Sequence, residues 1–227
     1  MRIVVAGAHG QIARRLGRLL STRGDSVVGI IRNAAHESDV VGDGVDPVVL
    51  DLESARPDQV ARVVRDADAV VFAAGAGPGS GAARKDTVDR GAAVLLADAA
   101  ERSGVGRYLL VSSMGVESVA DGATPEGVDE VFLAYLRAKL AAEQDLLARP
   151  GLTTTVLRPG SLTDDPARGR VTLARHVSRG SVPRDDVAAV LVALLDASAE
   201  GQVLELVGGA VPIDEAVAAA VRPGGRG

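Results

Sequence analysis

Short apolar runs alternate with amphipathic stretches along the whole chain. Most of the apolar runs lack strict alternation of polar and apolar residues, which is typical of strands buried on both faces of a sheet. This pattern predicts seven strands, at Arg2–Ala6, Ser26–Ile31, Pro47–Leu50, Ala69–Ala73, Arg107–Ser112, Thr153–Arg158 and Gln202–Val207.

The stretches between these strands carry apolar residues at helical spacing. In the first of them Leu16 and Leu20 share one face, and Gly24 follows as a stop signal. The predicted helices are Gln11–Arg23, Pro57–Asp66, Asp86–Ser103, Val128–Ala148, Asp185–Ala197 and Ile213–Val221. Regular repetition of strand and helix predicts an α/β fold with a doubly wound parallel sheet of about seven strands, a Rossmann-type domain.

The remaining segments are read as loops. Residues 34–46, 76–83 and 115–127 are polar or rich in Gly, Ala and Ser, and we expect them at the surface. We expect small cap elements on the substrate side near residues 161–184 and a frayed tail at 222–227. The 227 residues suit one domain with one buried core.

Composition removes several classes of function. The chain has no Cys, which excludes disulfides and thiolate chemistry, and its three His residues are far apart in sequence, so we expect no metal site. The net charge is -5 without a basic block, which argues against nucleic-acid binding. No apolar run has the length of a membrane span, and the first strand leaves no room for a signal peptide, so we expect a cytoplasmic protein.

The first strand–helix junction has the form Gly-x-x-Gly-x-x-Ala, at Gly7, Gly10 and Ala13. Gly7 allows a tight turn, and Gly10 lets the backbone approach a pyrophosphate at the helix N-terminus. The alternative is a merely tight turn, but the position between a strand and a helix is the context that the fingerprint requires. We therefore expect a dinucleotide site whose turn includes His9, Gln11 and Ile12.

The residues after the next strands indicate which dinucleotide binds. An NAD site usually has an acidic residue after the second strand, whereas this chain has Arg32, which can pair with the 2′-phosphate of NADP(H) or simply be an exposed arginine. Asp51 and Leu52, after the third strand, can present polar and apolar edges to the adenine. Small residues after the fourth strand let the backbone pass under the dinucleotide, at Ala73, Ala74 and Gly75.

With these motifs the chain resembles the short-chain dehydrogenase/reductase superfamily, and most closely its small atypical members of the epimerase/dehydratase type. The resemblance covers nearly the whole chain and extends to Val111-Ser-Ser113, Tyr135-Leu-Arg-Ala-Lys139 and Leu157-Arg-Pro-Gly160. It implies that Ser113 holds the substrate oxygen, that Ser112, Pro159 and Gly160 border the cofactor, and that Tyr135 and Lys139 form the catalytic pair. Asp89 stands where many relatives have an asparagine of the proton relay.

Tyr135 and Lys139 are four residues apart on a predicted helix, so both lie on one face. A nearby ammonium group stabilises a phenolate, and Tyr135 can then exchange a proton with a substrate oxygen while Lys139 also holds the cofactor ribose. The alternative is that Tyr135 packs among Phe132, Leu136 and Leu140 while Lys139 is solvated.

Four functions remain open. The favoured one is an NADP(H)-dependent reductase or dehydrogenase of a small carbonyl or alcohol. The others are an epimerase or dehydratase that retains its cofactor, a non-catalytic NADP(H) sensor, and a flavin or tetrapyrrole reductase, which the few aromatic residues disfavour. His176, Arg184 and Asp185 are either substrate-side or plain surface residues. Alanine-rich helix faces leave a homo-oligomer open.

Overall fold

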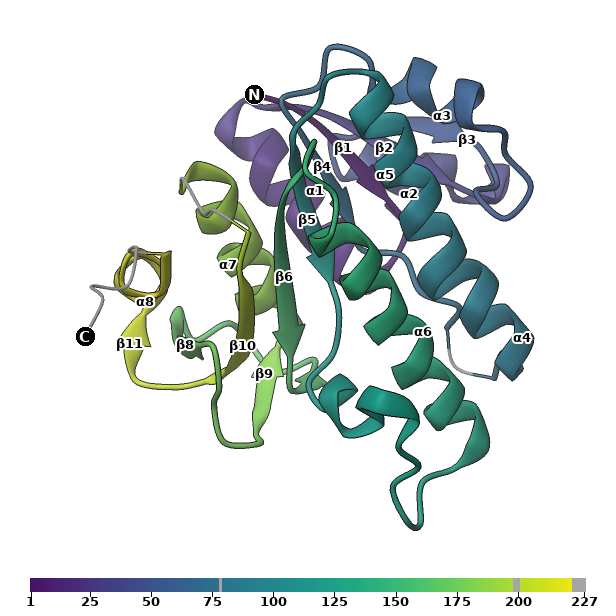
Figure 1. Cartoon of the computed structure of the whole chain (residues 1–227). Helices are drawn as coiled ribbons and strands as arrows, with labels where there is room; N and C mark the ends of the chain where they lie inside the picture. The colour runs from purple at the N-terminus through teal and green to yellow at the C-terminus, as the bar shows by residue number, and fades with distance from the viewer. Residues whose placement is uncertain (78, 198–200, 222–227) are drawn as a thin grey trace.

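A nine-stranded sheet lies between two layers of helices in the computed structural model, which describes residues 1–77, 79–197 and 201–221 (Figure 1). Seven of its strands run parallel in the order β10-β6-β5-β4-β1-β2-β3. They are β1 (Arg2–Ala6), β2 (Ser26–Ile31), β3 (Asp46–Val49), β4 (Ala69–Phe72), β5 (Arg107–Val111), β6 (Thr153–Pro159) and β10 (Val203–Gly208). The Rossmann-type α/β prediction is confirmed, and all seven predicted strands are present.

The strand order reverses at β1, which pairs with β2 on one side and with β4 on the other. In open α/β sheets ligands bind outside the carboxyl ends of the strands at such a switch point. In Figure 1 this edge is the lower one, where the arrow of β6 ends. The glycine turn directly follows β1 and therefore lies at the switch point.

The helices divide between the two faces of the sheet. On one face α1 (Gln11–Arg23), α7 (Arg184–Asp196) and α8 (Ile213–Val221) pack in one core with Leu16, Leu20 and Leu191 fully buried. On the other face α3 (Pro57–Val64), α5 (Ala93–Arg102) and α6 (Glu130–Leu147) bury Leu96 and Leu146 in a second core. Both cores are mainly aliphatic and alanine-rich.

The sheet is larger than predicted because two antiparallel strands extend it beyond β10. They are β8 (Arg170–Ala174), which pairs with β10, and β11 (Val211–Pro212), which pairs with β8. Two further strands, β7 (Ser161–Thr163) and β9 (Ser181–Pro183), form a separate parallel pair beside the carboxyl end of β6. The expected cap segment thus consists of short strands, and one of them belongs to the main sheet.

Three other predictions need correction. Residues 34–46, expected as a loop, form a 3-10 turn η1 (Ala34–His36) and the short helix α2 (Glu37–Gly42), which buries only Val40. The helix predicted at Asp86–Ser103 starts earlier, as α4 (Ala82–Arg84), and continues through a π-helical segment η2 (Lys85–Ala92) into α5. The segment expected as a loop at 115–127 contains the 3-10 turn η3 (Val116–Gly122). The tail expected to fray, 222–227, lies outside the described residues.

Candidate active site

The glycine turn leaves its backbone open toward the cleft. Gly7 has φ +79°, and a Cβ atom there would lie 2.6 Å from the Cα of Ala74. The N–H of Gly10 donates to the carbonyl of Gly7 at 2.8 Å, which closes the turn. Gly10 caps α1 without a side-chain hydrogen bond from the described residues. The N–H groups of the first turn of α1 therefore remain available to an anionic ligand.

One cleft runs along the carboxyl edge of the sheet in two halves, which share Ala73–Ala76 after β4. The first half is bounded by the glycine turn and by the ends of β2 and β3; its lining includes Gly7, His9, Gly10, Arg32, Asn33, His36, Asp51, Leu52, Glu53 and Arg84. The second half is bounded by the ends of β5 and β6 and by α6; its lining includes Lys85, Asp89, Ser112, Ser113, Asp129, Phe132, Tyr135, Lys139, Pro159 and Gly160.

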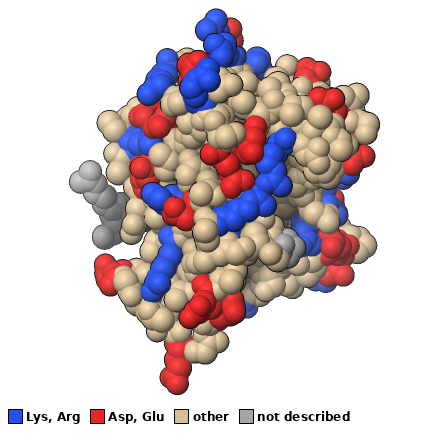
Figure 2. Space-filling view, turned by 90° about the vertical axis from the view of Figure 1, so that its right-hand side faces the viewer, with Lys and Arg blue, Asp and Glu red and all other residues tan. Residues whose placement is uncertain are grey.

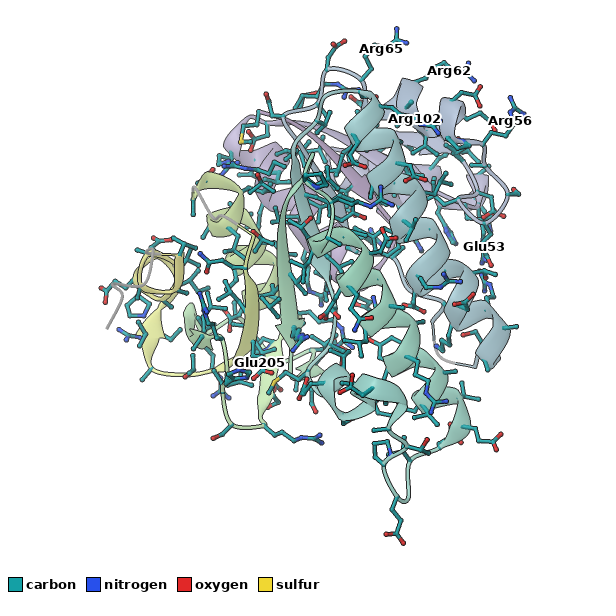
Figure 3. The ribbon with its side chains drawn as sticks, viewed as in Figure 1. Glu53, Arg56, Arg62, Arg65, Arg102 and Glu205 are labelled. Atoms are coloured by element: carbon teal, nitrogen blue, oxygen red, sulfur yellow. The ribbon has the colours of Figure 1, made fainter. Side chains whose placement is uncertain are left out.

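Charged side chains from three elements meet at the outer end of the first half. Glu53, in the loop after β3, accepts from Arg84 at 2.9 Å and from Thr87 at 2.7 Å, and its carboxylate lies 3.3 Å from Arg32. Figure 3 shows Glu53 at the right-hand edge, beside the segment that contains α4. The carboxylate thus holds two guanidinium groups at the mouth of this half.

Two histidines lie beside these arginines. The rings of His9 and His36 stack with centroids 3.6 Å apart, and His9 Nε2 lies 2.9 Å from a carboxylate oxygen of Asp39. His36 comes from the turn η1, which the sequence analysis read as an unstructured loop. The contact brings the glycine turn and the segment after β2 together around the same part of the cleft.

A buried ion pair lies under the second half. Lys139 Nζ donates to the carbonyl of Val111 at 2.9 Å and lies 3.3 Å from Asp89 Oδ1, and both side chains are nearly inaccessible to solvent. The other Asp89 oxygen accepts from the backbone N–H of Ala76 at 3.2 Å. The pair therefore connects η2, the end of β5 and α6, and it is Asp89 rather than solvent that balances the charge of Lys139.

Tyr135 stands above this pair, partly buried. Its ring centroid is 5.8 Å from Lys139 Nζ and 5.5 Å from Lys85 Nζ, so two ammonium groups flank the phenol. Tyr135 thus lines the cleft and also packs against the small apolar cluster that contains Leu133 and Leu136.

The two serines after β5 differ in their contacts. Ser113 Oγ donates to the carbonyl of Met114 at 3.1 Å, whereas Ser112 Oγ is buried and has no hydrogen-bond partner among the described residues. A buried hydroxyl without a partner is unusual. Both serines line the same half of the cleft as Tyr135, as the resemblance implies, and their separate roles stay predictions.

Most of the predicted site residues line the cleft, but some do not. The side chain of Gln11 accepts from Arg15 at 2.9 Å, and Ile12 packs against the core. Neither is among the residues that line the two halves of the cleft. Among the substrate-side candidates, Arg184 pairs with Asp164, Asp185 pairs with Arg15, and His176 is exposed.

Several residues that line the cleft were not among the predicted site residues. His36 enters the first half from the segment expected as a surface loop at 34–46, and Glu53 and Arg84 enter it from positions between the predicted elements. Lys85, Asp129, Val131, Phe132 and Leu162 enter the second half. The signal available for Asp129 was its position before an apolar helical stretch, because Asp is a preferred N-cap; its carboxylate accepts from Val131 and Phe132.

The cleft suits a dinucleotide on its own geometry. The open N-terminus of α1 offers backbone N–H groups to a pyrophosphate, and at the other end the buried Ser112 hydroxyl has no hydrogen-bond partner among the described residues. The first half would hold the adenosine and the second half the nicotinamide. Fold and site together define a nicotinamide dinucleotide-binding protein of the Rossmann type.

The comparison with known families agrees with this class. The family model described as NAD(P)H-binding matches residues 7–198, and the chain belongs to this family. The chain is 32% identical over 219 residues to the uncharacterised sugar epimerase YhfK of Bacillus subtilis, covering 96% of this chain and 99% of that protein.

Solved structures show the same fold over nearly the whole chain. A protein of Bacillus halodurans, provisionally assigned as an NAD-dependent epimerase/dehydratase, has a TM-score of 0.86 at 33% identity and covers 96% of this chain and 99% of its own. The anaerobilin reductase ChuY of Escherichia coli has a TM-score of 0.76 at 27% identity and covers 92% of this chain and 97% of its own. The atypical short-chain dehydrogenase/reductase resemblance is confirmed.

None of the described helices combines the length and the apolar character needed to cross a bilayer. Within residues 1–77, 79–197 and 201–221, no three His, Cys, Asp or Glu side chains are arranged to hold a metal ion.

Proposed function

We propose that the protein is an NADP(H)-dependent oxidoreductase that interconverts a small carbonyl compound and its alcohol. The observation that carries this proposal is the position of Tyr135 in the cleft, next to Lys139 and flanked by a second ammonium group. A bound nicotinamide supplies or accepts the hydride. The remaining chemistry is a proton transfer at the substrate oxygen.

Tyr135 would carry that proton. Its hydroxyl donates to the substrate oxygen in the reducing direction and accepts in the oxidising direction, and Ser113 or Ser112 orients the same oxygen. Lys139 is held by Val111 and Asp89, so it stays near Tyr135 and can hold the ribose hydroxyls of the cofactor. Asp89 fixes the ammonium group in the place where many relatives use an asparagine.

The preference for NADP(H) over NAD(H) rests on Arg32. The residue directly after β2 is an arginine that lines the adenosine half, and Arg84 faces the same region from α4. Both guanidinium groups lie next to the Glu53 carboxylate. This arrangement supports a site for the 2′-phosphate of NADP(H), in which Glu53 holds the two arginines in place before the cofactor binds.

Replacing Tyr135 with Phe tests the catalytic role. We expect turnover to fall by about 10²–10⁴-fold, because the proton donor is lost, while the affinity for the cofactor is unchanged. Oxidation of NADPH with a panel of aldehydes and ketones measures the rate, and fluorescence titration with NADPH measures binding. Turnover of Tyr135→Phe at the wild-type rate would remove Tyr135 from the mechanism.

An epimerase that retains its cofactor is the second candidate, favoured by the names of the Bacillus relatives. The epimerase and the reductase differ in how much NADPH they consume for each substrate molecule. An epimerase converts its substrate without net consumption of NADPH, whereas the proposed reductase consumes one NADPH for each product. Cofactor binding without either reaction would favour a sensor.

A further inference from the structure

The aromatic residues of this chain are distributed in an informative way. The chain has two Phe, two Tyr and no Trp, and all four lie in described parts of the structure. Phe72 and Tyr108 are completely buried in the core. The other two, Phe132 and Tyr135, both line the nicotinamide half of the cleft. Despite the low aromatic content, the cleft therefore offers an aromatic surface to a flat ligand.

The first turn of α6 fixes the position of these two rings. Asp129 caps the helix, and its carboxylate accepts from the backbone N–H groups of Val131 and Phe132 at 2.9 and 3.1 Å. Phe132 and Tyr135 are three residues apart, and their rings stack with centroids 5.7 Å apart at an angle of 26°. A capped helix thus presents an aromatic surface next to the proposed catalytic phenol.

Phe132 is part of a larger apolar surface. It is 49% exposed, and Val131 and Leu162, which line the same half of the cleft, are 36% and 37% exposed. Leu162 comes from β7, about thirty residues after the start of α6, so the convergence arises from the fold. Exposed apolar residues that gather at a cleft mark a binding site for an apolar ligand.

A cation completes this half of the cleft. Lys85 Nζ donates to the carbonyl of Gly77 at 2.8 Å and lies 5.5 Å from the Tyr135 ring centroid. Its neighbour Asp86 pairs with Arg90, and Asp129 is engaged as the cap of α6. Lys85 forms no ion pair with any described residue, so its charge is available to a ligand.

We propose that the substrate is a planar aromatic carbonyl compound with an anionic substituent, whose ring stacks on Phe132 and whose anionic group meets Lys85. This inference rests on the proposed function, because the ring must present its carbonyl to Tyr135. In the reducing direction the carbonyl carbon gains a hydride from the nicotinamide cofactor, and the oxygen gains the proton of the Tyr135 hydroxyl. The proton is then replaced from water, and the products are the alcohol and the oxidised cofactor.

Binding of matched probes tests the ring site without requiring turnover. The probes are 2-naphthoate, its saturated non-planar counterpart decahydro-2-naphthoate, and the neutral 2-naphthamide, each titrated calorimetrically into the protein with NADP(H) present. We expect 2-naphthoate to bind about tenfold more tightly than the saturated acid, because stacking adds to apolar burial. Phe132→Ala should remove this preference, and Lys85→Gln should weaken 2-naphthoate but not 2-naphthamide.

Leu147→Ala is the matched control for Phe132→Ala. Leu147 is at the other end of α6, is 41% exposed and does not line the cleft, so its loss should leave all three affinities unchanged. Both residues are on the surface, and thermal unfolding checks that both variants are folded. Equal binding of the planar and saturated acids, no binding of either, or no effect of Phe132→Ala would overturn the proposal.

A failure of this proposal is distinguishable from a failure of the proposed function. If the ring proposal alone is wrong, the protein still reduces some carbonyl compounds in a Tyr135-dependent way but does not prefer planar ones. If the oxidoreductase function alone is wrong, 2-naphthoate still binds through Phe132, but 2-naphthaldehyde is not reduced and Tyr135→Phe changes nothing.

Discussion

Gly7 is the residue on which the cofactor end of the cleft depends most. Its left-handed backbone lets the chain turn from β1 into α1, and the absence of a side chain lets Ala74 approach from the next loop. An L-residue is disfavoured in this conformation, and a Cβ would also collide with the backbone of Ala74. Both effects act where the pyrophosphate would lie.

Gly7→Ala should therefore weaken cofactor binding and stability together. We expect a loss of about 2 kcal/mol in the free energy of unfolding, from the left-handed backbone and the forced shift of Ala74. Urea unfolding measures stability, and nucleotide titration measures binding. Gly24→Ala is the control, because Gly24 also has positive φ but has no atoms near its missing Cβ, so only stability should fall. Unchanged NADPH affinity in Gly7→Ala would contradict the placement of the pyrophosphate.

At this scale the sequence predicted the residues that belong to local motifs. Gly7, Gly10, Ser113, Tyr135 and Lys139 line the cleft as expected, because each follows a strand or lies at helical spacing. Residues such as Glu53, Arg84 and Phe132 could not be predicted in the same way. Their positions in the cleft depend on how segments that are distant in sequence pack together. The sequence around a single charged or aromatic residue does not indicate this packing.

The short helix α2 buries only Val40 in the core, and charged contacts also join this segment to α1. Asp43, directly after α2, accepts from Arg14 at 2.6 Å and from Arg18 at 2.7 Å, and both arginines are on α1. Burial by itself would raise the pKa of the Asp43 carboxyl, but the two guanidinium groups outweigh it and hold that pKa below its ordinary value. The ionised carboxylate thus fixes α2 beside the glycine turn.

Asp43→Asn should lower stability at neutral pH by about 1–2 kcal/mol, because two charge-assisted hydrogen bonds are weakened. Since the folded pKa is lowered, the contribution of Asp43 is complete above the unfolded pKa and is lost as the pH falls through the folded value. The difference between wild type and variant should therefore shrink from neutral toward strongly acidic pH. Thermal unfolding at several pH values measures it, and a difference that grows on acidification would refute the assignment.

Helices with a clear apolar periodicity and strands formed by an apolar run were predicted almost to the residue, as α1 and β1 show. The short strands β7, β9 and β11 were not, because two or three residues carry no measurable alternation. The strand β8 lies among charged and small residues, and pairing with β10 rather than its own sequence defines it. The π-helical segment η2 depends on tertiary packing, and such segments often lie at functional sites; here it carries Lys85 and Asp89.

Over the whole molecule, acidic and basic side chains are interspersed on the face shown in Figure 2, and basic groups gather mainly at its top. A cluster of four arginines, Arg56, Arg62, Arg65 and Arg102, lies at the end opposite the cleft (Figure 3), and Arg62, Arg65 and Arg102 border one surface hollow there. Arg56 and Arg62 lie near Asp58, so part of this charge is compensated on the surface. These arginines do not form a continuous basic block in the sequence, because they come from α3, from the residues on either side of α3, and from α5.

The central claim is that the cleft binds NADP(H) through Arg32, and nucleotide titration tests it most directly. Fluorescence titration with NADPH and NADH is made on the wild type, on Arg32→Ala and on Arg62→Ala, which removes the same charge at the opposite end. We expect NADPH to bind about tenfold or more tightly than NADH to the wild type and to Arg62→Ala, and Arg32→Ala to lose that preference. Binding of neither nucleotide would contradict the account, and an undiminished preference in Arg32→Ala would contradict the role of Arg32.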